Sequence, residues 1–248
     1  MGKTHEALVR AEKEYQENLL GTLREPLLPK WVAPPKRTSN QTIIEWYEDL
    51  KTNLLTRYPD RSIKTILFNA TKHGGGCSTT AINFATALAN NSKFKVLHVD
   101  VNLRTPSLHE VFKIDDTRGL SDLSANSDLM MDQIKKVGPG DLYVLTSGGN
   151  YTVPLGLFES IVFDQFLKTV RKKFNYIILD APPIPRFSEC RILARKADGV
   201  VLVLEAGKIR RQVALNAKKA LEDAGAKLLG VVLNRKKRYI PKWIYKRI

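Results

Sequence analysis

The sequence predicts an α/β fold in which a doubly wound, mostly parallel sheet is flanked by helices. From residue 62 onward, short apolar runs alternate with helical patterns, and several of the runs are unbroken, as in parallel strands covered on both faces. The expected strands are residues 63–68, 95–101, 142–145, 176–179, 200–204 and 228–233. The expected helices between them are residues 79–90, 126–137, 157–173, 187–196 and 209–224. In such sheets, functional residues gather where the strands end.

The chain is expected to divide into three parts. Residues 1–38 predict a helix followed by a proline-containing arm, because apolar residues at three- and four-residue spacing give way to four prolines. Residues 39–235 predict the α/β domain, which opens with a helix over residues 42–55. Residues 236–248 form a basic tail in which aromatic and aliphatic residues alternate with Lys and Arg.

Composition limits the kinds of protein that this chain can be. With 43% hydrophobic and 26% charged residues, it has the make-up of a globular protein, and no apolar run reaches the roughly 18 residues of a membrane span. The two cysteines are too few for a disulfide framework, which favours the cytoplasm. The net charge of +15 favours an acidic partner, either nucleic acid, an anionic membrane or an acidic protein, over a solvated basic surface.

A glycine-rich segment joins the first strand of the domain to the next helix. Residues 71–80 read Thr-Lys-His-Gly-Gly-Gly-Cys-Ser-Thr-Thr. Glycines let backbone N–H groups close around an anion, and a helix N-terminus favours negative charge, so this segment predicts a phosphate-binding loop. Such a loop usually carries a lysine directly before its Ser or Thr, and here that position is Cys77. The expected nucleotide contacts in the loop are His73, Gly74, Gly75, Gly76, Cys77, Ser78 and Thr79.

Two aspartates end buried strands close to this loop. Asp180 follows Tyr-Ile-Ile-Leu and predicts an Mg²⁺ contact through water, although a strand-end aspartate also caps turns. Asp100 follows Val-Leu-His-Val and could bind a metal or act as a base. The Ser78 hydroxyl would bind Mg²⁺ directly, with a helix N-cap as its alternative role. Ser78, Asp100 and Asp180 are therefore the expected metal ligands, and the two aspartates are also expected catalytic residues.

The loop and the two strand ends together resemble the deviant P-loop ATPases, which include chromosome-partitioning and division-site-placement ATPases. A closer resemblance is to the bacterial tyrosine kinases (BY-kinases), cytoplasmic partners of polysaccharide co-polymerases, because Arg104, Pro106 and His109 match that family's second acidic motif. The similarity covers roughly residues 40–235. It implies a P-loop NTPase fold, ATP and Mg²⁺ as cofactors, tyrosine autophosphorylation, a role in exopolysaccharide or capsule export beside a membrane co-polymerase, and Asn234 near the adenine.

The sequence departs from the BY-kinase pattern at several places, and the departures agree with one another. The loop lysine is Cys77, and the second acid of the Asp-x-Asp motif is Asn102. The oligomerising Glu-x-x-Arg-x-x-Arg helix reads Glu45-x-x-Glu48-x-x-Lys51, and the tyrosine cluster is reduced to Tyr239 and Tyr245. Together they predict a degenerate relative with weak ATP binding, weak or absent kinase activity and a homo-oligomer altered from the family's ring.

Three interpretations remain open beside this one. Lys72 stands where partitioning-type ATPases carry a signature lysine, so it is a candidate catalytic cation of a working ATPase or autokinase, or else an exposed strand-end lysine. Cys77 could be a reactive thiol at a helix N-terminus or, as we favour, a small neutral filler. The basic tail suits the inner face of the plasma membrane, but also suits nucleic acid, as in a positioning ATPase, or a final helix packed on the domain.

Overall fold

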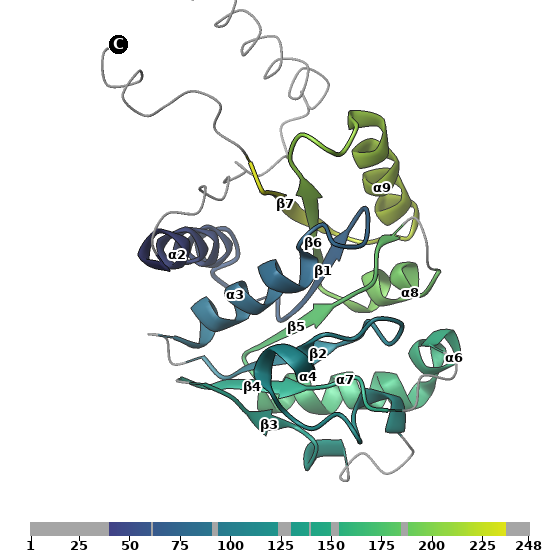
Figure 1. Cartoon of the computed structure of the whole chain (residues 1–248). Helices are drawn as coiled ribbons and strands as arrows, with labels where there is room; N and C mark the ends of the chain where they lie inside the picture. Colours follow the sequence, from purple (N-terminus) through teal and green to yellow (C-terminus); the bar gives the residue numbers. More distant parts are fainter. Residues whose placement is uncertain are drawn as a thin grey trace, which may run out of the picture.

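The structure, a computed structural model, describes residues 40–236 apart from residues 61, 91–93, 124–129, 139, 150–153 and 185–187. In this part of the chain, seven strands form one sheet in the order β3-β4-β2-β5-β1-β6-β7, with only the β3–β4 pair antiparallel. Helices cover both faces of the sheet (Figure 1). This confirms the predicted doubly wound α/β fold. The predicted N-terminal arm and all but the first residue of the tail lie outside the described residues.

The elements follow the predicted alternation of strands and helices. The strands are β1 (Thr65–Ala70), β2 (Val96–Asp100), β3 (Lys135–Lys136), β4 (Leu142–Leu145), β5 (Tyr176–Asp180), β6 (Gly199–Glu205) and β7 (Leu228–Asn234). The helices are α2 (Asn40–Arg57), α3 (Cys77–Ala89), α4 (Leu108–Phe112), α6 (Pro154–Glu159), α7 (Ile161–Lys173), α8 (Glu189–Lys196) and α9 (Arg211–Asp223), with a 3-10 turn at Leu120–Asp122.

One predicted helix is wrong over much of its length. The sequence pattern predicts a helix at residues 126–137, but the described part of this stretch is helical only at residues 130–131 and then forms β3, which pairs with the edge of β4. Gly138 and Gly140 adopt positive φ angles of 60° and 84° and turn the chain into β4. Pairing with an open sheet edge therefore overrides local helical periodicity, and the exposed lysines of β3 suit an edge strand.

A second predicted helix is divided in two. The expected helix at residues 157–173 is observed as α6 and α7, which are separated by Ser160. The Ser160 hydroxyl accepts a hydrogen bond from the backbone N–H of Phe163 at 3.2 Å, so it caps α7. The hydroxyl also donates to the carbonyl of Leu157 at 2.7 Å and thereby links the two helices.

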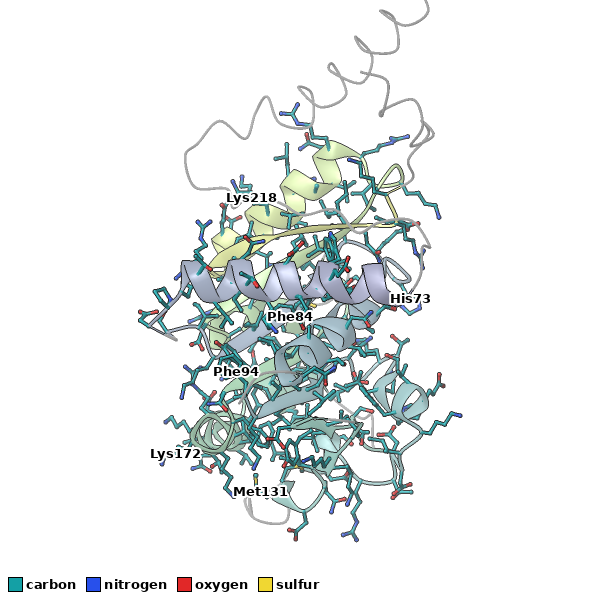
Figure 2. All side chains as sticks on the ribbon, turned by 90° about the vertical axis from the view of Figure 1, so that its left-hand side faces the viewer. His73, Phe84, Phe94, Met131, Lys172 and Lys218 are labelled. Carbon is teal, nitrogen blue, oxygen red and sulfur yellow. The ribbon has the colours of Figure 1, made fainter. Side chains whose placement is uncertain are left out.

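The central strands contribute side chains to two separate hydrophobic cores, because alternate side chains point to opposite faces of the sheet. On β1, Ile66 and Phe68 pack with Phe84 of α3 and with aromatic residues of α2, whereas Leu67 packs with residues of α7 and α8 on the other face. Figure 2 looks onto the α2 face and shows His73 at one side of the molecule and Phe94 at the other. These residues mark the two ends of the parallel strands, since His73 follows β1 and Phe94 precedes β2.

Helix α2 is fixed to α3 by a buried lysine as well as by apolar contacts. The Lys51 ammonium donates to the carbonyl oxygen of Ala87, in the last turn of α3, at 3.2 Å. Lys51 also forms an ion pair with Glu48, one turn earlier on α2. Both charged groups are thus engaged within the chain. Among the described residues, no helix has the length and apolar character needed to cross a bilayer.

An aspartate before β6 anchors the start of β1 and the end of α7. One oxygen of Asp198 accepts hydrogen bonds from the backbone N–H groups of Lys64 and Thr65 at 2.9 and 2.8 Å. Its other oxygen is 2.8 Å from Nη2 of Arg171, whose Nη1 donates to the Thr65 hydroxyl at 3.0 Å. This contact fixes the central strand of the sheet against the helix that covers it.

Replacing this aspartate should destabilise the domain. Asp198→Ala leaves two backbone donors and a guanidinium without their acceptor, so we expect the free energy of unfolding to fall by about 2–3 kcal/mol. Urea denaturation followed by circular dichroism measures this change. Asp223→Ala, the same substitution at an exposed position at the end of α9, is the matched control and should stay within about 0.5 kcal/mol of the wild type. Equal stability of the two variants would contradict the anchoring role.

Candidate functional site

The glycine-rich loop connects β1 to α3 at the carboxyl edge of the sheet. Gly74 and Gly76 have φ angles of 72° and 88°, in the left-handed region that favours glycine. A Cβ on Gly76 would lie 1.8 Å from Nδ2 of Asn234, so this position also requires glycine for space. The Asn234 amide, at the end of β7, donates to the carbonyl of Gly75 at 3.1 Å. The side chain predicted to lie near the adenine therefore closes the loop from β7, which is separated from β1 by β6.

The first turn of α3 presents backbone N–H groups toward the loop. The helix begins at Cys77, its N-cap is Gly76 without a side-chain cap, and its first turn carries no acidic residue. The Thr80 hydroxyl donates to the carbonyl of Gly76 at 2.7 Å, and no N-cap side chain accepts from the N–H groups of this turn. Such an end can cradle a phosphate. In this part of the loop, Ser78 is partly buried and Thr79 is exposed.

The two predicted carboxylates lie next to each other at the ends of neighbouring strands. Asp100 and Asp180 are register partners in the β2–β5 pair, and both are buried. Neither oxygen of Asp180 has a hydrogen-bond partner among the described residues. Burial and then the charge of Asp100 raise the pKa of Asp180 to about 7, an effect that the neighbouring Ser78 and Cys77 side chains oppose. A buried, unpartnered carboxylate beside a phosphate loop fits a divalent cation.

Asp100 is held in place by the turn that follows β2. It accepts backbone hydrogen bonds from Asn102 at 3.1 Å, Ser107 at 2.9 Å and Leu108 at 3.1 Å. Burial raises its pKa to about 6, these three bonds lower it, and the charge of Asp116 adds to the rise. In the described part of the chain, no group of three or more His, Cys, Asp or Glu side chains could hold a metal. A Mg²⁺ ion would therefore rely on Ser78, Asp100 and Asp180 together with water and phosphate oxygens.

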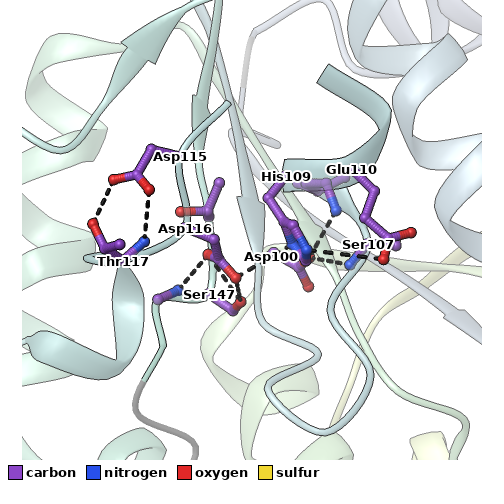
Figure 3. A network of polar contacts seen from close by, with 12 residues as sticks. Asp100, Ser107, His109, Glu110, Asp115, Asp116, Thr117 and Ser147 are labelled. Carbon is purple, nitrogen blue, oxygen red and sulfur yellow. Dashed lines mark hydrogen bonds and ion pairs between the residues drawn. The ribbon is translucent and has the colours of Figure 1, made fainter. Parts of the chain in front are cut away.

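A further polar network adjoins Asp100 and was not predicted from the sequence. Asp116 accepts hydrogen bonds from the Ser147 hydroxyl at 3.3 Å and from the N–H of Gly148 at 2.8 Å. Its Oδ2 also lies 3.3 Å from Nδ1 of His109 (Figure 3). Asp116 follows no apolar run, so the strand-end rule that identifies Asp100 and Asp180 gives no signal here. The network fixes α4 to the segment after β4.

The thiol that replaces the usual loop lysine lies beside Asp180. Burial first, and then the Asp180 charge, raise the pKa of Cys77 well above the ordinary thiol value. A thiol with a raised pKa stays protonated at neutral pH and is a poor nucleophile. This supports the interpretation of Cys77 as a neutral filler over that of a reactive thiol. Cys190 is also inert, because burial raises its pKa to about 12.

Asn102, which stands at the second acidic position, closes a local turn. Its amide Nδ2 donates to the carbonyl and to the hydroxyl oxygen of Thr105, both at 3.0 Å. A carboxylate could not make these two donor contacts. Nearby, Nε of Arg104 is 2.6 Å from a side-chain oxygen of buried Glu189, so the turn is also fixed to α8.

Lys72 is directed to a carboxylate that the sequence analysis did not identify. Its ammonium is 2.6 Å from Oε2 of Glu205, the last residue of β6. Glu205 is buried and ends an apolar run, as Asp100 and Asp180 do, so the same strand-end rule could have found it. The structure thus brings together the loop, Ser78, Asp100, Asp180 and Asn234, while Lys72 is paired with Glu205 and His73 is exposed.

The fold and this site define a class of protein, the P-loop NTPases. The family model described as "AAA domain" matches residues 63–217. The chain is 34% identical over 193 residues to the tyrosine-protein kinase YwqD of Bacillus subtilis, covering 78% of this chain and 81% of that protein. It is 33% identical to the tyrosine-protein kinase CpsD of Streptococcus agalactiae, covering 77% and 82%. The chain belongs to the bacterial tyrosine-protein kinase (BY-kinase) family.

Solved structures agree with this assignment. The chimerical protein CapA2B2 superposes with a TM-score of 0.78 at 29% identity, covering 90% of this chain and 99% of that one. The cell division ATPase MinD of Pyrococcus furiosus superposes with a TM-score of 0.59 at 25% identity, covering 74% and 78%. Both resemblances predicted from the sequence, to BY-kinases and to division-site-placement ATPases, are therefore confirmed at the level of the fold, and the TM-score is higher for CapA2B2 than for MinD.

Proposed function

We propose that this protein is a degenerate BY-kinase relative that binds nucleotide weakly, has little or no kinase activity, and supports exopolysaccharide or capsule assembly through a membrane co-polymerase. The observation that carries the proposal is that the loop's cation position is occupied by the thiol of Cys77, beside Asp180. The glycine loop and the start of α3 would hold the phosphates of ATP, and Ser78, Asp100 and Asp180 would hold Mg²⁺. When bound, Mg²⁺ would neutralise phosphate charge.

A working ATPase or autokinase that uses Lys72 is the second candidate. The observation in its favour is that Lys72 belongs to the loop and has a partly exposed side chain, which could turn toward phosphate. Against it stand the ion pair with Glu205 and the loss of a carboxylate at Asn102. A positioning ATPase on membrane or DNA is a third candidate, supported by the MinD likeness and the basic charge.

Nucleotide affinity should be low and should rise when the loop cation is restored. Losing a charge-assisted phosphate contact of about 1.5–3 kcal/mol weakens binding by about tenfold to more than a hundredfold. Calorimetry with ATP and Mg²⁺ should therefore show Cys77→Lys binding at least about tenfold more tightly than the wild type. Cys77→Ser is the matched neutral control and should bind as weakly as the wild type. Low-micromolar binding by the wild type would show that another group replaces the lysine.

Tyrosine autophosphorylation should be weak or absent. Phosphoryl transfer depends on positioning and on charge stabilisation at the phosphates, and Cys77 and Asn102 each remove one charged participant. Mass spectrometry of the purified protein after incubation with ATP and Mg²⁺ measures the phosphate on Tyr239 and Tyr245. Stoichiometric phosphate that is abolished by Asp180→Ala would favour the active kinase instead.

The family's ring should be weakened or altered. Glu48 reverses one charge of the oligomerising helix, and Lys51 is engaged with Glu48 and with the carbonyl of Ala87. An interface contact with a partner's carboxylate would therefore become repulsive or unavailable. Light scattering at micromolar protein should show a monomer or dimer, and a stable octamer would contradict this expectation.

We further propose that the protein works at the inner face of the plasma membrane, held there by its basic tail. Each Lys or Arg near an anionic leaflet contributes about 1 kcal/mol. In a sedimentation assay, the protein should bind anionic but not neutral vesicles and should lose this binding when residues 236–248 are deleted. Equal binding after the deletion would remove the tail's role, and tight, salt-sensitive binding to duplex DNA would favour the positioning ATPase.

A further inference from the structure

Three cations from three parts of the chain converge on the buried carboxylate of Glu205. Oε2 lies 2.6 Å from the Lys72 ammonium in the loop. Oε1 lies 2.8 Å from the Lys208 ammonium and 3.3 Å from Nη1 of Arg235, which follow β6 and β7. The Glu205 side chain is only 2% exposed, whereas all three partners are partly exposed. The contacts with Lys208 first, and then with Lys72, lower the pKa of Glu205 to about 2, so it is ionised at neutral pH.

Lys72 contacts one oxygen of Glu205, and the other two cations contact the other oxygen. Lys72 is therefore the partner that can leave. Removing a partner from an isolated buried ion pair is costly because it leaves a buried charge uncompensated. Here Lys208 and Arg235 both contact Oε1, so the carboxylate keeps two cations when Lys72 departs from Oε2. Lys72 has a long, flexible side chain that is 39% exposed, and it is the only Lys or Arg in residues 71–80.

The position of the cluster relates it directly to the phosphate loop. Glu205 is the register partner of Asn234 in the β6–β7 pair, and Asn234 closes the loop through the carbonyl of Gly75. The Arg235 N–H in turn donates to Oδ1 of Asn234 at 2.8 Å. The carboxylate that holds Lys72 is therefore built into the same strand ends that shape the loop.

We propose that Glu205 is a positioning residue that stores Lys72 away from the phosphate loop, and that Lys72 moves from Glu205 to the phosphates when a nucleotide binds. The inference rests on the proposed nucleotide-binding function. Because the stored ion pair must be broken for the ammonium to reach phosphate, Glu205 competes with the nucleotide and lowers its affinity. The low affinity of the loop then has two causes, the missing lysine at Cys77 and the sequestered lysine at position 72.

A double-mutant cycle on the full chain tests this competition, with ATP and Mg²⁺ as the probe in calorimetry. Glu205→Gln keeps an acceptor for Lys208 and Arg235 but weakens the hold on Lys72, so it should tighten binding about threefold to fivefold. Lys72→Met should weaken binding by a similar factor. In the Lys72→Met background, Glu205→Gln should have no effect, because the stored cation is absent.

The controls separate storage from general electrostatics and from folding. Glu222→Gln removes one negative charge from the exposed face of α9, where Glu222 pairs with Lys218 at 3.4 Å, and should leave affinity unchanged. Thermal unfolding shows that each variant is folded. If Glu205→Gln tightens binding equally with and without Lys72, or if it weakens or does not change wild-type binding, the storage role is wrong while the nucleotide-binding function stands. If neither wild type nor Glu205→Gln binds ATP, both proposals fail.

Discussion

Two buried carboxylates that lie side by side at the ends of β2 and β5 set the main electrostatic constraint on this domain. Asp100 is compensated by three backbone N–H groups, whereas Asp180 has no hydrogen-bond partner among the described residues. Burial, with the charge of Asp116, raises the pKa of Asp100 to about 6, and burial, with the charge of Asp100, raises the pKa of Asp180 to about 7. In a loop with the usual lysine, a cation would stand where the Cys77 thiol stands. The arrangement is therefore short of positive charge at its centre, in a protein whose net charge is +15.

The fold was predictable because its central strands are buried on both faces and therefore read as unbroken apolar runs. β1, β2 and β5 lie within one or two residues of their expected positions, and Asp100 and Asp180 were identified from the ends of such runs. The helix expected at residues 126–137 is wrong beyond residue 131, for a physical reason. Periodicity reports only a local preference, while β3 is formed by pairing with β4 and by two glycines at positive φ.

The positions of the candidate site residues were predictable from the sequence, but their contacts were not. The ion pair of Lys72 with Glu205 depends on where β6 lies relative to β1, which no local pattern encodes. The same holds for Asp116, whose partners come from α4 and from the segment after β4. Asn234 was expected near the adenine, and the structure shows its amide closing the loop on Gly75. Such contacts arise from tertiary packing between residues far apart in the sequence.

The contact between Lys51 and the end of α3 links the surface charge of α2 to the interior of the domain. Lys51 is turned inward to the carbonyl of Ala87 and is neutralised by Glu48 on the same helix. A single mutation of Glu48 to arginine would place two cations one turn apart and would deprive Lys51 of its counter-charge. A change of charge on the surface of α2 would therefore be felt inside the fold, at the last turn of α3.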